Sequence, residues 1–317
     1  NNENNSENNV NINSDNNSNA LVKYLTAMDE LHNKKIDELE DSLKSRKLSQ
    51  IIRFKFIQFL LELITKKDGK LPSDYDVAKI IATNYDGLNQ EVNFIQVGAC
   101  DGDWSKSNDP IQRLILTSEH WHGIMMEPVP YLFKKLEISV AKTIKDYKDR
   151  IHLLNAALSD RDGLQTFYTV NKHFGEEMPH ETHALKHQIG SFNIEHIYKH
   201  LNVKIKRGQL KNDVNYYITP INVTSMTPLS VVNEFKKSGK SVRDGNIDIL
   251  LIDAEGYDYI LLGSFLDIPI IRPVLVVYEH LHLNEEDKKK AINILESHGY
   301  ITVGVGWNTF GVRVAEL

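Results

Sequence analysis

The sequence has a single cysteine, an excess of acidic over basic residues and no long apolar run. Cys100 alone excludes an intramolecular disulfide framework, and no charged-then-apolar leader opens the chain, so we expect a reducing, cytoplasmic location. The longest strongly apolar helical candidate, Ile51 to Ile64, contains Arg53, Lys55 and Glu62, and is too short and too charged to cross a bilayer. A net charge of -6 does not favour binding to a phosphate backbone, so we expect neither a membrane span nor nucleic acid as a main partner.

Composition divides the chain into three segments. Residues 1–20 contain 11 Asn with almost nothing to bury, which predicts a disordered tail. In residues 21–90 apolar side chains recur at helical spacing between charges, which predicts a helical extension that packs on the domain or on a partner, including a second copy in a homo-oligomer. Residues 91–317 remain for one large core, which the 41% hydrophobic content can supply.

After residue 90 the pattern changes to short apolar runs separated by helical stretches, which is typical of a parallel sheet covered on both faces. The turn-like stretch Gly306 to Thr309 joins the last two runs, and so short a link permits only an antiparallel hairpin. The predicted fold class is therefore α/β, a doubly wound (Rossmann-like) mixed sheet of seven strands with an antiparallel last strand. The predicted strands are residues 93–97, 123–126, 151–154, 247–252, 274–278, 300–304 and 310–314.

Ligands of open α/β sheets bind beyond the carboxyl ends of the strands, so the residues that follow each run are candidates for a site. After the first strand, Gly98 and Gly102 allow the backbone to turn tightly and approach a ligand, with Ala99 and Asp101 between them. An ordinary strand-to-helix turn is the alternative. Nicotinamide-dependent oxidoreductases have three glycines as G-x-G-x-x-G and an acid about 20 residues later, whereas Glu127 comes later here, so that class is disfavoured.

The second and third strands add further candidates for binding a nucleoside. Glu127, followed by Pro128, places a carboxylate where the two hydroxyls of an adenosine ribose would lie. The third strand runs into small residues that leave room for a flat adenine edge, where Ala157, Leu158 and Asp160 are the candidate contacts. A plain turn begun by Ser159 and Asp160 and ended by Gly163 is the alternative reading of that segment.

Four ionisable residues follow the fourth and fifth strands, and we assign them the catalytic role. Asp253, which is also a candidate contact of the cofactor, and Glu255 come after the fourth strand, and Glu279 and His280 end the fifth. Ionisable groups at the mouth of a buried strand are costly unless they are used or paired, so their joint placement predicts an active site. The sequence leaves open whether Asp253 or His280 is the general base.

Residues 171–217 are predicted to form a lid or an acceptor-binding insertion, because a long segment at this rim of the sheet is usually functional. We expect no sheet character between Phe167 and Tyr217, where six of the 13 histidines lie. His180, His183 and His187 would share one helical face, so a transition-metal site is conceivable there, although no cysteine or second motif completes it. A polar lid is the alternative.

The segments described above resemble the FkbM family of class I methyltransferases, over Asn93 to about Val314. The resemblance implies S-adenosylmethionine as methyl donor, with Gly98 and Asp101 near its methionine part and Glu127 on its ribose, and it makes Ser191 a candidate contact. It also implies an O-methyltransferase that acts on a hydroxyl of a sugar, a glycoconjugate or a related small molecule, and an antiparallel last strand is typical of methyltransferases. The segments that carry the resemblance are residues 94–102, 126–128, 155–160, 248–256 and 308–312.

One departure and two alternatives accompany this resemblance. Many relatives have Thr-Leu-Asp before the fourth strand, whereas this chain has Thr227 before a proline, a plausible N-cap of the following helix. Asp253, Glu279 and His280 are similar in placement to the magnesium ligands of catechol-type O-methyltransferases, and with a histidine among them manganese is favoured over magnesium if an ion binds. The metal-free alternative, in which His280 paired with one of the acids is the general base, is slightly favoured over a metal site. The alternative function is a catalytically weak donor-binding or scaffold protein that uses its N-terminal helices for a partner, and the intact acidic rim argues against it.

Overall fold

The computed structural model describes residues 92–102, 120–178, 189–237, 247–269 and 271–313. The tail predicted at residues 1–20 and the helical extension predicted at residues 21–90 lie outside the described residues. Within the described ranges, none of the helices combines the length and the apolar character that crossing a membrane requires.

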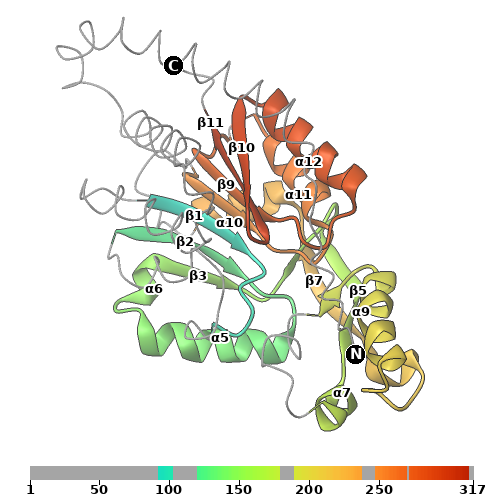
Figure 1. Ribbon diagram of the computed structural model, residues 1–317. Helices are drawn as coiled ribbons and strands as arrows, with labels where there is room; N and C mark the ends of the chain where they lie inside the picture. The colour runs from blue at the N-terminus through green and yellow to red at the C-terminus, as the bar shows by residue number, and fades with distance from the viewer. Residues whose placement is uncertain (1–91, 103–119, 179–188, 238–246, 270, 314–317) are drawn as a thin grey trace, which may run out of the picture.

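The main sheet has the seven predicted strands, in the order β10-β11-β9-β8-β1-β2-β3 (Figure 1). Strand β11 pairs antiparallel with both β9 and β10, while the other neighbours pair in parallel, so the antiparallel last strand is confirmed. The strands are β1 (Val92–Val97), β2 (Trp121–Met126), β3 (Ile151–Leu154), β8 (Ile249–Ile252), β9 (Leu275–Glu279), β10 (Tyr300–Val305) and β11 (Asn308–Arg313).

Helices cover both faces of this sheet, as the apolar runs predict. Successive side chains of a strand point to opposite faces, so Phe94 of β1 packs into the core that α5 covers and Ile95 packs into the core under α10, α11 and α12. Both side chains are almost fully buried. The helices on the main sheet are α5 (Pro130–Thr143), α6 (Tyr147–Arg150), α10 (Pro228–Lys237), α11 (Asp258–Leu266) and α12 (Glu285–Ser297).

A second sheet of four strands, in the order β4-β7-β5-β6, lies on the side toward which the parallel strands point (Figure 1). The prediction of no sheet character between Phe167 and Tyr217 is wrong, because β5 continues to Val170 and β6 pairs with it. The pairing of β5 with β7 joins segments that are far apart in the sequence, so no local pattern reveals it. This layer consists of β4 (Ala157–Leu158), β5 (Gly163–Val170), β6 (Gly190–Ser191), β7 (Ile218–Met226), α7 (Lys172–Glu177), α9 (Ile194–Lys206) and the 3-10 helix η2 (Val214–Tyr217).

Helix α10 begins where the chain departs from the pattern of its relatives. Thr227 Oγ1 accepts a hydrogen bond from the Ser230 N–H at 3.3 Å, so the predicted N-cap is confirmed. The Asp162 carboxylate accepts from the Thr227 N–H at 2.7 Å and from the Ser230 hydroxyl at 2.8 Å. Thr227 and Asp162 therefore hold the first turn of α10 together.

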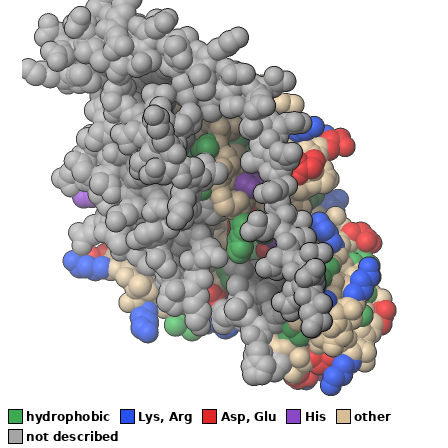
Figure 2. Space-filling view, viewed as in Figure 1, with side chains coloured by type: hydrophobic (Ala, Val, Ile, Leu, Met, Phe, Trp, Pro, Cys, Tyr) green, Lys and Arg blue, Asp and Glu red, His purple; other side chains and the backbone are tan. Residues whose placement is uncertain are grey.

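Charges of both signs are interspersed on the outer helices in the view of Figure 2. On α12, Lys290 Nζ lies 2.8 Å from Glu286 and 3.4 Å from Asp287, and Lys288 Nζ lies 2.9 Å from Glu285. Such exposed pairs contribute little to stability, typically below about 1 kcal/mol each. On these helices they distribute charge rather than concentrate one sign.

Candidate functional site

The loop after β1 packs closely against the loop after β8, and this packing requires a glycine at position 98. Gly98 has φ +82°, and a Cβ at this position would lie 2.1 Å from the backbone oxygen of Asp253. The N–H groups of Gly98 and Ala99 both donate to the Met126 carbonyl, at 3.0 and 2.8 Å. Cys100, with φ +53°, continues this irregular backbone. The sequence therefore builds a tight loop whose backbone can approach a ligand closely.

Glu127, at the end of β2, is tied to that loop by its side chain. One carboxylate oxygen accepts from the Cys100 N–H at 2.9 Å and the other from the Val129 N–H at 2.8 Å. Burial raises the pKa of Glu127 to about 7, although these two hydrogen bonds oppose the shift. Each oxygen of a carboxylate has two acceptor positions, so the group retains the capacity to accept two hydroxyl donors.

The other residues predicted to bind the donor differ in burial and in whether their polar groups already make hydrogen bonds. Asp101 and Gly102 are buried in the loop after β1, and Pro128 is half-buried beside Glu127. Ala157 and Leu158 form strand β4, with buried side chains, and the stretch from Ser159 to Gly163, where a plain turn was the alternative, connects β4 to β5. The carboxylates and hydroxyls farther along are already engaged locally, since Asp160 accepts from the Ser159 hydroxyl at 3.1 Å and Ser191 Oγ accepts from the Asn193 N–H at 3.1 Å.

A buried aspartate that sequence reasoning missed shapes the loop after β8. The Asp258 carboxylate accepts from the N–H groups of Ala254 and Gly256, at 3.1 and 3.0 Å. Asp258 is fully buried, and burial raises its pKa to about 7. Glu255, which lies between the two bonded residues, has φ +51°, a left-handed backbone conformation that is uncommon for residues other than glycine. The loop thereby turns Glu255 out of the line of the strand, while Asp253 stays half-buried at its end.

Three imidazoles and two carboxylates meet beside the ends of β8 and β9. Nε2 of His196 lies 3.2 Å from Glu255 Oε2, and Nε2 of His282 lies 3.4 Å from the same oxygen and 3.6 Å from Glu279 Oε2. The ring of His200 lies 4.6 Å from that of His196, centroid to centroid. Helix α9 supplies two of these histidines, so the predicted insertion does reach the rim of the main sheet.

Burial dominates the electrostatics of this cluster. It lowers the pKa of His196 to about 3 and that of His282 to about 4, with neighbouring imidazoles adding to the shift. Burial also raises the pKa of Glu279 to about 8 and raises that of Glu255, which is flanked by other acids. Burial therefore disfavours the charged form of each of these imidazoles and carboxylates, and the 3.2 Å contact between His196 and Glu255 is within hydrogen-bond distance.

The metal-ligand set predicted from the sequence, Asp253 with Glu279 and His280, is not the set that the structure brings together. Nδ1 of His280 lies 3.0 Å from Thr309 Oγ1 on the terminal hairpin, and burial lowers the pKa of this imidazole. Glu279 and His280 are successive residues at a strand end, so their side chains point in different directions. Glu279 is grouped instead with Glu255 and His282, which follows it by three residues.

An open groove of about 590 Å³ lies between the start of α5 and the second sheet. Val129 and Tyr131, which follow Glu127, line one part of it, and Asn171 and Phe174 from the predicted insertion line another. The insertion therefore contributes to a groove as well as to the histidine cluster. The run of histidines between residues 180 and 187 lies outside the described residues.

Comparisons with known proteins place this geometry in a family. Residues 96–302 match the family model described as the methyltransferase FkbM domain. Among solved structures the chain is similar to precorrin-6y C5,15-methyltransferase from Geobacter metallireducens GS-15, with 11% identity, coverage of 78% of this chain and 90% of that chain, and a TM-score of 0.31. It is also similar to the ribosomal protein L11 methylase from Lactobacillus delbrueckii subsp. bulgaricus, with 9% identity, coverage of 76% and 79%, and a TM-score of 0.31.

No curated protein sequence matches the chain. At such identities and TM-scores, the two solved structures say nothing about the substrate of this chain. The family match carries the assignment, because it covers more than half of the chain and includes the ends of β1, β2, β8 and β9. The chain belongs to the FkbM family of methyltransferases, whose methyl donor is S-adenosylmethionine.

Proposed function

We propose that this protein is an S-adenosylmethionine-dependent O-methyltransferase that acts on a hydroxyl of a sugar, a glycoconjugate or a related small molecule. The observation that carries the proposal is the Glu127 carboxylate, held by the Cys100 and Val129 N–H groups against the tight loop after β1. A carboxylate fixed at the end of the second strand suits the two ribose hydroxyls of a nucleoside.

The residues present fit the donor. The close approach to Asp253 requires a glycine at position 98, and because glycine has no side chain, a ligand can approach the backbone of this loop closely. Glu127 is placed to accept hydrogen bonds from the ribose, and Asp101 lies in the same loop. When bound, S-adenosylmethionine supplies an electrophilic methyl group carried on a sulfonium. The protein contributes by binding the donor and by orienting the acceptor so that its oxygen lies about 3 Å from the methyl carbon.

Asp253 is the residue we propose as general base. A protonated hydroxyl is a poor nucleophile, so a neighbouring group must take its proton during transfer. Asp253 adjoins both the loop after β1 and the glutamate cluster. Its backbone oxygen packs against Gly98, and its charge contributes to raising the pKa of Glu255. His280, the other candidate, has its Nδ1 against Thr309 on the terminal hairpin. The predicted metal ligands Asp253, Glu279 and His280 are not grouped around a common point in the structure, so no step of the proposed transfer uses a metal bound by them.

The experiment is a donor titration followed by an acceptor screen. S-adenosylhomocysteine and NAD are titrated into the protein by calorimetry, and the protein is then incubated with S-adenosylmethionine and a panel of sugars, glycoconjugates and hydroxylated small molecules. Binding of S-adenosylhomocysteine but not NAD, with acceptor-dependent release of S-adenosylhomocysteine, is the expected result. Donor binding without turnover on any acceptor would favour the scaffold alternative, and binding of NAD alone would overturn the donor assignment. A cytoplasmic location and a partner for the N-terminal helices stay predictions from the sequence.

A further inference from the structure

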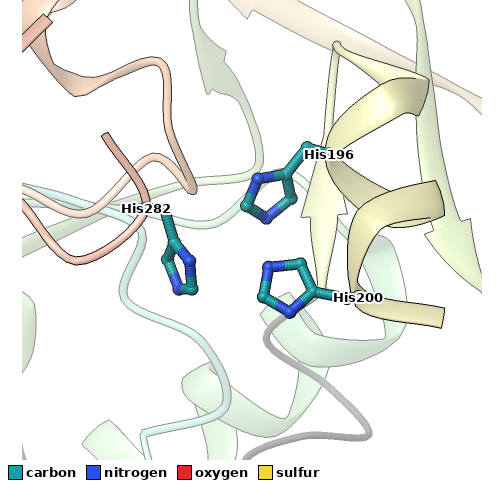
Figure 3. Close-up of side chains that lie close together, drawn as sticks. All are labelled: His196, His200 and His282. Carbon is teal, nitrogen blue, oxygen red and sulfur yellow. The ribbon is translucent and has the colours of Figure 1, made fainter. Parts of the chain in front are cut away.

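Three imidazoles meet beside the carboxyl ends of β8 and β9, and the proposed methyl transfer assigns them no role (Figure 3). His196 and His200 are four residues apart on α9, so their rings leave the same face of the helix. His282 reaches them from the segment after β9. The ring centroids of His282 lie 5.1 Å from His196 and 4.8 Å from His200. One ring nitrogen of each residue lies within 4.8 Å of the other two.

Carboxylates from two strand ends adjoin these rings. Glu255 Oε2 lies 3.2 Å from a nitrogen of His196 and 3.4 Å from a nitrogen of His282. Ligands placed about 2.1 Å from a tetrahedral ion are about 3.4 Å from one another. Glu255, Glu279 and His282 form a second group of three whose ligand atoms lie within 4.8 Å of each other. Within each group of three the spacing is therefore that of ligands around one ion, and His282 is common to both groups.

Hydrogen bonds within the cluster leave two buried atoms unexplained. Oε2 of Glu279 has no hydrogen-bond partner among the described residues, and this glutamate is only 9% exposed. Nε2 of His200 is buried without a partner in the same part of the chain. Buried polar atoms are bonded in the great majority of cases, and the exceptions call for an explanation such as an ion. A cation that accepts a lone pair from each atom provides it.

The surroundings hold the ligand-bearing elements in place. Helix α9 begins with the Asn193 side chain accepting from the Glu195 N–H at 3.0 Å, and it buries Ile197 and Leu201 in the core of the second sheet. Gly256 has φ +91°, and a Cβ there would lie 3.4 Å from His196 Nδ1, so a glycine permits the close approach of the helix.

We propose that the imidazoles of His196, His200 and His282 bind one divalent first-row transition-metal ion, whose coordination a glutamate from each neighbouring strand end completes. Glu255 and Glu279 are those glutamates. Imidazole nitrogen with carboxylate oxygen suits zinc, manganese, iron and cobalt, whereas magnesium prefers an all-oxygen set with several waters. Asp253, the general base of the proposed function, directly follows strand β8, and Glu255 lies two residues further along the same loop. The metal site itself does not depend on that function.

The test measures metal binding directly, on the full-length protein without an affinity tag. After removal of metal with EDTA and dialysis, Zn²⁺ is titrated by calorimetry, and bound zinc is counted by elemental analysis. We expect one zinc per chain, a rise in melting temperature with zinc, and no comparable binding of Mg²⁺. The substitutions His200→Ala and His282→Ala should each weaken zinc binding about 100-fold or more, because each removes a ligand.

His173→Ala is the matched control, since His173 lies on α7 and its Nδ1 contacts Glu176 at 2.9 Å, outside the cluster. His183→Ala separates this site from the histidines of the segment outside the described residues. Should either cluster variant fail to fold, Glu279→Gln, which keeps the shape of the side chain, provides the same comparison. Donor binding, measured with S-adenosylhomocysteine, should persist in His200→Ala and His282→Ala, which separates loss of the metal from failure of the proposed function. Zinc affinity equal to wild type in the cluster variants, or less than one zinc per chain, would overturn the proposal.

Discussion

The Glu127 carboxylate accepts a hydrogen bond from the backbone N–H of Cys100 at 2.9 Å, which joins the end of β2 to the loop after β1. This contact gives the site its shape before any ligand arrives, because the carboxylate and the loop hold each other. A group that is fixed in this way binds a diol with little further ordering. The first two predictions test its role.

Substitution of Glu127 by alanine should weaken binding of S-adenosylhomocysteine by about 1–3 kcal/mol, the cost of losing charge-assisted hydrogen bonds to the ribose. Isothermal calorimetry measures the change. Glu137→Ala is the control, because Glu137 is on the same side of the fold, on α5, and pairs at the surface with Lys134. Unchanged affinity in the Glu127 variant would remove this residue from the donor site.

Donor affinity should also depend on pH through Glu127. Its pKa is raised to about 7 by burial, so lowering the pH from 8 to 6 protonates it and removes acceptor capacity. The ionised fraction falls about tenfold over that range, and the affinity for S-adenosylhomocysteine should fall by up to about tenfold with it. In Glu127→Gln, which does not titrate, the affinity should be lower at pH 8 and nearly flat between pH 6 and 8. An equal pH dependence in both proteins would assign the titration to another group.

Gly98→Ala should destabilise the fold by about 2 kcal/mol or more and abolish donor binding. The added Cβ would meet the Asp253 backbone oxygen at 2.1 Å, and alanine is strained at φ +82°. Gly175→Ala is the matched control, because this glycine lies in α7 with nothing within 4 Å of the added carbon, so it should be neutral or slightly stabilising. Thermal denaturation compares the two, and equal melting temperatures would show that the loop can relax.

The main sheet could be predicted from the sequence because each strand is a short apolar run that is buried on both faces. Strand β1 is buried at all six positions, and the terminal hairpin is set by its short link. The second sheet could not be predicted in this way. Strand β7 does alternate exposed and inward positions from Pro220 to Ser225, but polar residues such as Thr169 and Ser225 occupy buried positions of this sheet, so the alternation is not one of apolar with polar residues. A proline within β7 also argues, from sequence alone, against a central strand.

The candidate site was predicted where it depends on strand ends and missed where it depends on tertiary contact. Glu279 is the last residue of β9 and Glu255 lies three residues beyond the end of β8, and the two strands are neighbours, so the proximity of these glutamates follows from the sheet. His282 lies just beyond a strand, and only the packing of α9 brings His196 and His200 to it. The four-residue spacing of the two helical histidines was a usable signal, but nothing in the sequence named their partner.

The last prediction concerns the proton of the acceptor. Asp253→Asn keeps the shape of the side chain and the backbone oxygen that packs on Gly98, so binding of S-adenosylhomocysteine should change by less than about threefold. An amide cannot take the proton, however, so kcat on an acceptor found by the screen should fall about 100-fold to 10,000-fold. The matched variant is His280→Gln, which should retain most of the activity because the His280 ring contacts Thr309 on the terminal hairpin. Single-turnover methyl transfer, followed by product release, measures both. If His280→Gln loses the greater part of the rate while Asp253→Asn retains it, the base is the histidine, and the hairpin contact of His280 must then be a positioning contact.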